Sequence, residues 1–227
     1  MGGRAEGKYV SIMSPFRPSA GPPIRPVVLA GGAASRFGGR PKGLELVGGV
    51  RILDRVVDAM VEAFGTPPIL IANDPGAAAW RPDLEVRADL RPGEGALGGI
   101  LSAVHAGAGA PVVVAAWDMP FVPSALLREL AAGLADQDAV LPASDGRRGV
   151  EPLLAAYGPA CEPAILRALD RGDRRAIAFH DGVRVGILPL ERVRTHGDPA
   201  LIFLNVNTSD ELAQAEAVWL ARGSSPS

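Results

Sequence analysis

Short apolar runs alternate with amphipathic stretches along residues 26–221. Residues 27–29 and 112–116 are compact apolar runs, and the first is closed by glycines, which is typical of buried strands. Residues 51–64 gather their apolar side chains on one helical face and keep most charged ones off it, which predicts an amphipathic helix. Such alternation favours a mostly parallel sheet with helices on both faces. We therefore expect an α/β fold, a three-layer α/β/α Rossmann-like domain.

The same patterns predict the remaining elements and the limits of the domain. Further strands are expected at residues 69–71, 84–87, 140–141, 153–157, 183–188 and 201–204, and further helices at residues 98–106, 124–134, 160–169 and 208–221. Ser124 is a candidate N-cap, and Thr208 with Glu211 spells a capping box. Residues 1–25 are predicted to be a flexible N-terminal tail, residues 26–222 a single domain and residues 223–227 a frayed end.

Composition excludes several classes of function. Aromatic residues make up 5% of the 227 residues and the formal net charge is −2, which argues against a nucleic-acid partner. No apolar run reaches the length of a membrane span, and no secretory signal is present, so we expect a cytoplasmic protein without membrane contact. A single cysteine, Cys161, cannot form an internal disulfide and is interpreted as a small buried hydrophobe.

The loop after the first predicted strand carries the strongest chemical signal. Leu29, Ala30, Gly31 and Gly32 lead into a glycine-rich segment that contains two cations, Arg36 and Lys42. Glycines let backbone amides approach a phosphate closely, and the two cations could neutralise a triphosphate. The segment is not a Walker loop, and from composition alone a flexible turn with solvated cations remains an equal alternative.

A second signal follows the strand predicted at residues 112–116. Asp118 comes just after this strand, and parallel strands present their carboxyl ends, where ligands bind, on one side of the sheet. A carboxylate there could hold a hard cation such as Mg²⁺ together with phosphate oxygens. An aspartate that merely begins the turn before Pro120 is the alternative.

Taken together, these segments resemble the nucleotidyltransferases that include MobA, the molybdenum cofactor guanylyltransferase. The double glycine followed by Arg36 and Lys42 is similar to the superfamily signature, and Trp117-Asp118-Met119-Pro120 is similar to a segment whose aspartate binds the metal. This chain has Trp117 where the family often has cysteine. Gly98 belongs to a stretch resembling the segment that lies against the nucleotide in the family.

The resemblance also implies roles for polar residues elsewhere in the chain. An aspartate at the place of Asp89 accepts hydrogen bonds from guanine in the guanylyl enzymes, and Asn73 is a weaker match to a nucleotide-binding asparagine. Asn205 and Asn207 lie in a segment similar to one that faces the pterin substrate. We expect these two amides to share one side of a strand, because residues two apart do so. Arg174 and Arg175 are candidates for the acceptor's phosphate, with a solvated loop as the equal alternative.

The implied reaction is magnesium-assisted transfer of GMP from GTP to the terminal phosphate of molybdopterin. Arg36, Lys42 and Asp118 would be the catalytic residues, Asp118 the metal ligand, and Mg²⁺ the cofactor. Proteins that deliver molybdopterin or receive the finished cofactor are possible transient partners. We expect Lys42 and Asp118 to face each other across a gap that fits a triphosphate.

Three alternatives to this reaction remain at the level of sequence. A related enzyme could use CTP or another phosphate acceptor, and a non-catalytic protein could keep the fold and bind nucleotides. Residues 93–98 also match G-x-G-x-x-G, with Asp118 at the spacing of a dinucleotide-binding fingerprint. That motif should close the first buried strand, however, and it does not, which argues against a nicotinamide-dependent oxidoreductase.

Overall fold

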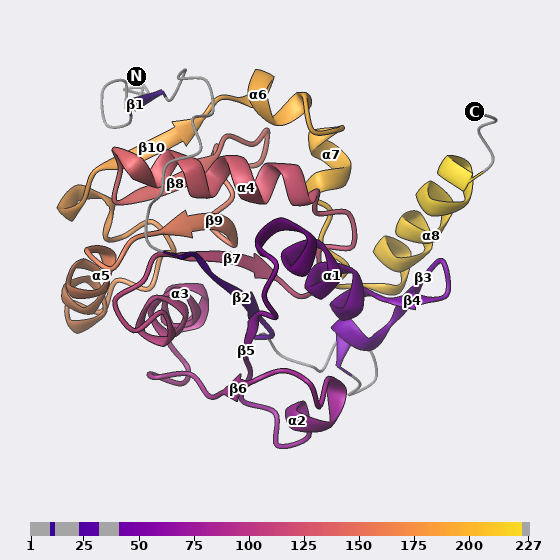
Figure 1. Ribbon diagram of the computed structural model, residues 1–227, viewed down its shortest axis with the longest axis horizontal. Helices are drawn as coiled ribbons and strands as arrows, with labels where there is room; N and C mark the ends of the chain where they lie inside the picture. Colours follow the sequence, from indigo (N-terminus) through magenta and orange to yellow (C-terminus); the bar gives the residue numbers. More distant parts are fainter. Residues whose placement is uncertain (1–9, 12–22, 32–40, 224–227) are drawn as a thin grey trace.

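The computed structural model describes residues 10–11, 23–31 and 41–223, and its main element is a central sheet with helices on both faces (Figure 1). Within these residues the sheet has eight strands in the order β1-β10-β8-β9-β7-β2-β5-β6. Neighbouring strands run parallel except β9, which is antiparallel to both β7 and β8. The expected three-layer α/β/α fold with a mostly parallel sheet is therefore confirmed.

The bounds of the elements follow the chain in order. The strands are β1 (Val10–Ser11), β2 (Arg25–Leu29), β5 (Ile69–Ile71), β6 (Val86–Arg87), β7 (Val112–Ala116), β8 (Ala139–Pro142), β9 (Leu154–Tyr157) and β10 (Val185–Leu188), with a separate hairpin of β3 (Leu46–Val47) and β4 (Val50–Arg51). The helices are α1 (Ile52–Phe64), α2 (Ala77–Trp80), α3 (Gly95–Ala106), α4 (Ser124–Ala132), α5 (Cys161–Asp170), α6 (Leu190–Arg194), α7 (Pro199–Ile202) and α8 (Ser209–Gly223). Short 3-10 turns occupy η2 (Lys42–Leu44), η3 (Gly133–Ala135) and η4 (His180–Gly182).

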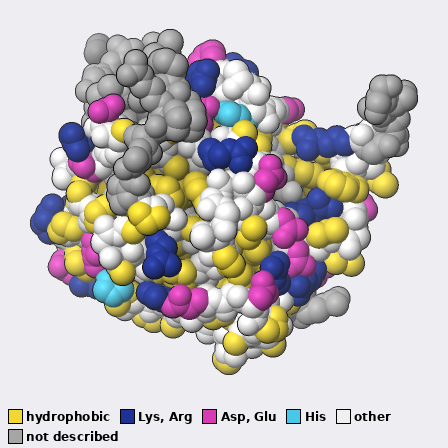
Figure 2. Space-filling model, viewed as in Figure 1, with side chains coloured by type: hydrophobic (Ala, Val, Ile, Leu, Met, Phe, Trp, Pro, Cys, Tyr) yellow, Lys and Arg dark blue, Asp and Glu magenta, His cyan; other side chains and the backbone are white. Residues whose placement is uncertain are grey.

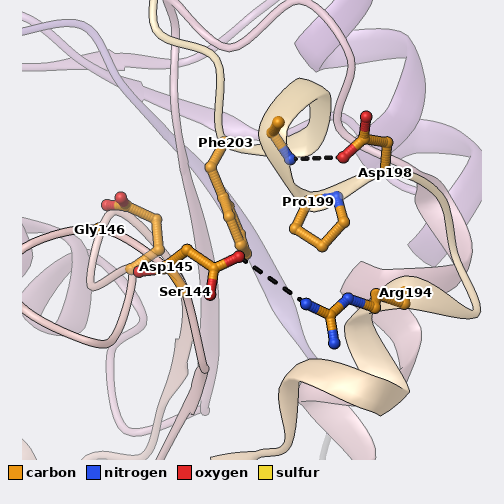
Figure 3. A pocket seen from close by; sticks show the side chains of 9 residues that line it. Ser144, Asp145, Gly146, Arg194, Asp198, Pro199 and Phe203 are labelled. Carbon is orange, nitrogen blue, oxygen red and sulfur yellow. Dashed lines mark hydrogen bonds and ion pairs between the residues drawn. The ribbon is translucent and has the colours of Figure 1, made fainter.

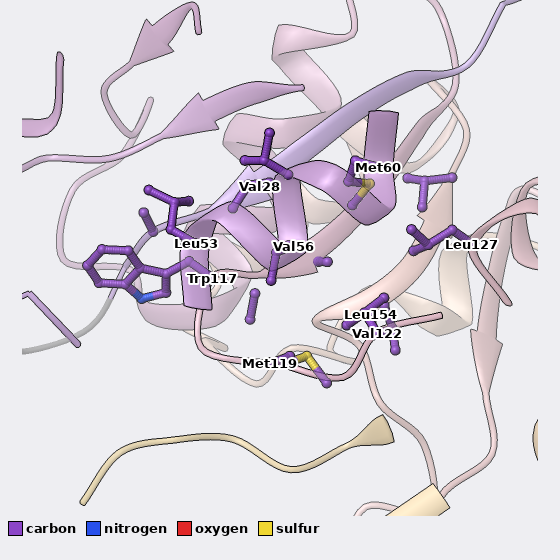
Figure 4. Close-up of a cluster of buried hydrophobic side chains, with 14 of the residues drawn as sticks. Val28, Leu53, Val56, Met60, Trp117, Met119, Val122, Leu127 and Leu154 are labelled. Atoms are coloured by element: carbon purple, nitrogen blue, oxygen red, sulfur yellow. The ribbon is translucent and has the colours of Figure 1, made fainter. Parts of the chain in front are cut away.

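Alternation along the central strands builds two cores, one on each face of the sheet. Val28 joins a cluster with α1 and α4, whereas its neighbours Val27 and Leu29 join a cluster with α3 and α5. Figure 4 shows the first cluster, in which Leu53 and Val56 of α1 lie close to Trp117 and Val28. Because β2 and β7 are covered on both faces, all the strand residues between Pro26 and Leu29 are buried.

Three local expectations were wrong, each for a physical reason. Residues 201–204 do not form a strand: Pro199–Ile202 is a helical turn, because the Asp198 side chain accepts a 2.9 Å hydrogen bond from the Ala200 amide and proline follows it. The segment after α7 is irregular, so Asn205 and Asn207 do not lie on a strand. Ser124 does not cap α4; its hydroxyl donates to Glu62 of α1 at 2.7 Å.

Elements from both ends of the described chain take part in the fold. Two residues from the segment predicted to be a tail, Val10–Ser11, pair in parallel with β10 at one edge of the sheet. At the other end of the chain, α8 packs on the β3–β4 hairpin and projects from the body (Figure 1). No helix within the described residues is long and apolar enough to cross a bilayer.

Candidate active site

Lys42 and Asp118 meet at the carboxyl end of the two central strands. Asp118 follows β7, and the amide of the intervening Trp117 donates to the carbonyl of Leu29 at the end of β2, at 3.1 Å. Lys42 opens the η2 turn, and its Nζ donates to Asp118 Oδ2. Both side chains are largely buried, with 14% of Lys42 and 8% of Asp118 exposed. The two residues are thus in direct contact, rather than facing each other across an open gap.

Asn207 completes this group from the other end of the chain. Its Oδ1 accepts a 2.7 Å hydrogen bond from the same Lys42 Nζ. The preceding amide, on Val206, donates to the carbonyl of Asp118 at 2.9 Å, which ties the segment to the end of β7. Glu211 in α8 accepts from the Asn207 amide at 2.7 Å and fixes its backbone. One ammonium group is therefore held between a carboxylate oxygen and an amide oxygen.

Asn205 lies two residues away but makes a different contact. Its side-chain nitrogen donates to the carbonyl of Phe203 at 3.0 Å, which stabilises the irregular segment after α7. The two asparagines are therefore close along the chain, and the described contacts connect only Asn207 to the lysine and aspartate.

The start of the glycine-rich loop is described only as far as Gly31. Leu29 ends β2, and the Ala30 amide donates to Ile71 in β5 at 2.8 Å, so the chain leaves the sheet between β5 and β7. Gly31 is exposed, and a Cβ there would meet nothing within 4 Å. Gly32 and Arg36 lie outside the described residues.

Asn73 and Asp89 form a second polar pair, at the ends of β5 and β6. Asn73 Nδ2 donates to Asp89 Oδ2 at 2.6 Å, and Asn73 Oδ1 accepts from the Asp89 amide at 2.8 Å. These two bonds set the direction of a partly exposed carboxylate. The next amide, on Leu90, donates to the Ser102 hydroxyl at 2.9 Å, and that hydroxyl donates to the carbonyl of Gly98 at 2.8 Å.

Sequence reasoning missed Ser102, although a signal was available. It is a buried hydroxyl among the apolar residues of helix α3, and it joins the Asp89 segment to that helix. Gly98 lies one turn earlier, where a Cβ would come within 2.8 Å of the Glu94 side chain and 3.1 Å of the Arg91 carbonyl. Glycine there lets residues 91–94 fold closely over α3.

Arg174 and Arg175 lie on the α3–α5 side of the molecule. They follow α5, whose buried residues share a core with α3. Arg174 pairs with Glu94 just before α3, and Arg175 pairs with Asp173 at 2.6 Å. The structure thus places Arg174 beside the segment of Gly98, rather than beside Asn205 and Asn207.

A cavity of about 290 Å³ lies between the turn after β8 and the segment of α6 and α7. Its walls include Glu151, Phe203 and Asp198, and in Figure 3 Arg194 and Asp145 face each other near the Phe203 ring. Burial raises the pKa of the Glu151 carboxyl, and the charge of nearby Asp118 adds to that rise. Phe203 belongs to the same segment as Asn207, so this cavity is the hollow next to the irregular segment.

One face of the molecule carries mixed charge. On the face drawn in Figure 2, the described basic side chains are interspersed with acidic ones. Cys161 is buried at the start of α5, and burial raises the pKa of its thiol to about 12, which fits the interpretation as a small hydrophobe.

The carboxyl end of the central strands thus brings together a lysine, an aspartate and the start of a glycine-rich loop, an arrangement suited to the phosphates of a nucleotide. The model of the MobA-like NTP transferase domain matches residues 26–185. The chain belongs to the MobA-like NTP transferase family, and it is an enzyme of the nucleotidyltransferase class. The nicotinamide-dependent alternative is thereby excluded.

Individual relatives agree with this assignment. The chain is 32% identical to the molybdenum cofactor guanylyltransferase of Desulfosudis oleivorans, over 84% of this chain and 93% of that protein. It is 36% identical to the enzyme of the same name from Mesorhizobium japonicum, over 85% and 94% respectively. Among solved structures, molybdopterin-guanine dinucleotide biosynthesis protein A from Archaeoglobus fulgidus aligns with a TM-score of 0.73 and 28% identity, covering 87% of this chain and 100% of that one.

Proposed function

We propose that this enzyme transfers GMP from GTP to molybdenum-molybdopterin, giving the guanine dinucleotide cofactor and pyrophosphate. The names of the similar enzymes support this activity. The structural observation that carries the proposal is the Lys42 ammonium held by Asp118 and Asn207 at the carboxyl end of β2 and β7. Ligands bind at such strand ends in open α/β sheets, and the glycine-rich loop begins at the same end.

The reaction joins two phosphates. An oxygen of the acceptor's terminal phosphate forms a bond to the α-phosphorus of GTP, the bond from that phosphorus to the bridging oxygen breaks, and pyrophosphate leaves. No general base is needed, because a phosphate monoester is largely ionised at neutral pH. Catalysis then depends on positioning the phosphates and neutralising their charge, which is the role of Arg36 and Lys42 in this proposal.

The donor set around Lys42 fits Mg²⁺. The carboxylate oxygen of Asp118 and the amide oxygen of Asn207 both accept a hydrogen bond from Lys42 Nζ. The two oxygens therefore already point toward one positive charge. The described residues contain no group of three or more acidic, histidine or cysteine side chains that could hold a metal. Mg²⁺ commonly binds through one or two carboxylates and takes its other oxygens from substrate phosphates and water. Asp118, with Asn207, would hold the ion, which supplies charge neutralisation at the phosphates.

Guanine recognition is assigned to Asp89. A carboxylate can accept from both N–H groups on the guanine N1 and N2 edge, and cytosine has no matching pair of donors. Asn73 supports this role by holding one carboxylate oxygen, which orients the side chain before the base arrives. Leu29, Ala30, Gly31 and Gly32 would approach the phosphates with their backbone, and Gly98 would let the α3 segment lie close to the nucleotide.

The acceptor would enter from the side of the irregular segment. Asn207 and Asn205 belong to this segment, and the cavity lined by Phe203 adjoins it. Arg174 and Arg175 remain candidates for contact with the acceptor's phosphate, although each is paired with an acidic side chain. Proteins that deliver molybdopterin or receive the product would dock transiently near this entrance.

A panel of the four NTPs with Mg²⁺ and molybdopterin tests the proposal, with pyrophosphate release as the readout. Release that requires both molybdopterin and GTP is the expected result, and Asp118→Asn serves as the matched control. Equal release with CTP would assign the chain to the alternative of a less selective or cytidylyl relative. Release that does not depend on molybdopterin would remove the proposed acceptor.

A further inference from the structure

Trp117 occupies the position between β7 and Asp118, and it contacts the turn that carries Lys42. Its indole ring stacks on Trp80, with the ring centroids 5.0 Å apart and an interplanar angle of 22°. The backbone of Gly43 lies directly against the same ring: a Cβ at Gly43 would come within 2.6 Å of Trp117 Cδ2 and 3.1 Å of its Cγ. No side chain larger than hydrogen fits at Gly43 while the ring stays in place.

The ring is held in this position at a cost to stability. Trp117 is 4% exposed, and its Nε1 finds no hydrogen-bond partner among the described residues. A buried N–H without a partner is unfavourable, so a hydrophobic ring without that N–H would serve packing alone better. Support of the turn that carries Lys42 would explain why a tryptophan whose N–H is unpaired within the described part of the chain occupies this position. Residues that are unfavourable for stability are expected mainly at functional sites.

Lys42 needs such support because its own side chain is flexible. Four methylene groups separate its Nζ from the backbone, and the η2 turn is a single 3-10 turn closed by a 3.0 Å bond from the Leu44 amide to the Pro41 carbonyl. The position of this turn above the sheet therefore decides where the ammonium falls relative to Asp118. The Trp117 ring packs against this turn at Gly43, and Trp80 stacks on that ring.

We propose that Trp117, supported by Trp80, is a positioning residue that places Lys42 against Asp118 and Asn207 for catalysis. The inference rests on the proposed function, since it assumes that Lys42 acts on the triphosphate. Misplacing a catalytic group by about 1 Å can cost roughly 100-fold in rate. Loss of the ring should therefore lower kcat more than it raises the KM for GTP.

The test measures kcat and the KM for GTP by pyrophosphate release in a set of folded variants. Trp117→Ala should lower kcat by roughly 10- to 100-fold, whereas Trp117→Phe, which keeps an aromatic ring, should lose much less. Combined with Lys42→Ala, the change Trp117→Ala should add no further loss, because the group it positions is already absent. Trp219→Ala is the matched control, because the Trp219 ring also lies against a glycine. That glycine, Gly48, belongs to the β3–β4 hairpin, so the kcat of Trp219→Ala should stay near the wild-type value.

Gly43→Ala tests the same contact without removing the ring. It should lower kcat in the wild-type background, and Trp117→Ala should restore part of that loss by making room for the new methyl group. A wild-type kcat in both Gly43→Ala and Trp117→Ala would overturn the inference. A double variant of Trp117→Ala and Lys42→Ala whose loss in kcat equals the product of the two single losses would overturn it as well. If Lys42→Ala itself keeps the wild-type kcat, the proposed role of Lys42 fails first and the inference falls with it.

Discussion

Replacing Asp89 with asparagine removes the charge that is proposed to read guanine, while the shape of the side chain is nearly preserved. The backbone of this segment is held by bonds that the substitution leaves in place, from the Asp89 amide to Asn73 Oδ1 at 2.8 Å and from the Leu90 amide to Ser102 at 2.9 Å. The new amide can still accept from Asn73 with its oxygen. Its NH₂ group then faces the two N–H donors of guanine, where the carboxylate faced them before.

The size of the effect follows from the exposure of the site. Hydrogen bonds to charged groups contribute about 1.5–3 kcal/mol each, and the lower end applies here because Asp89 is partly exposed to water. Loss of both bonds should therefore weaken GTP binding by about 3 kcal/mol, or roughly 150-fold in the KM for GTP. The melting temperature should barely change, since the exposed pair contributes little to folding.

Steady-state pyrophosphate release with GTP and ITP as substrates measures this effect. ITP lacks the 2-amino group, so wild type should prefer GTP over ITP by about one charge-assisted hydrogen bond, roughly 10-fold. Asp89→Asn should reduce this preference. An Asp89→Asn enzyme with an unchanged KM for GTP and an unchanged GTP/ITP ratio would refute the assignment of guanine recognition to this residue.

Three further predictions concern residues outside the reacting centre. Ser102→Ala should lower the free energy of unfolding by about 1 kcal/mol, because the hydrogen bond from the Leu90 amide to the buried Ser102 hydroxyl is lost; chemical denaturation measures it, and an unchanged midpoint would contradict the expectation. Glu151→Gln should stabilise the protein above pH 4.5: burial raises the pKa of this carboxyl in the folded state, so the wild type loses stability as pH rises from the ordinary value to the raised one. Melting temperatures of both proteins across pH check this, and parallel curves would speak against it. Cys161 should stay unlabelled by a thiol reagent at pH 8 in the native enzyme and react after unfolding, because burial raises its pKa to about 12; rapid native labelling would show the thiol to be accessible.

Much of the fold could be predicted because hydrophobic pattern and burial are closely linked. The apolar runs at residues 26–29 of β2 and 112–116 of β7 have no polar position that could face water, so they belong at the centre of a covered sheet. Adjacent parallel strands present their carboxyl ends together, which is why Lys42 and Asp118 could be expected on one side of the sheet. Their direct contact could not be predicted, because it depends on how the η2 turn packs against the end of β7.

Other features depend on signals that the apolar pattern does not contain. Residues 201–204 have the composition of a short strand, but the Asp198-Pro199 start makes a helical turn, and short apolar runs do not distinguish the two. The apolar residues of β9 likewise do not indicate that this strand runs antiparallel to β7. The Trp80–Trp117 stack joins residues from distant parts of the chain, so only tertiary packing brings it next to Gly43.

The central claim is that Asp118, paired with Lys42, serves the transfer of GMP to molybdopterin. Single-turnover pyrophosphate release from GTP, with molybdopterin and saturating Mg²⁺, compares wild type with Asp118→Asn most directly. We predict a loss of at least about 100-fold in the rate, with a cooperative unfolding transition that shows the variant is folded. A folded Asp118→Asn enzyme that releases pyrophosphate at the wild-type rate would contradict the account.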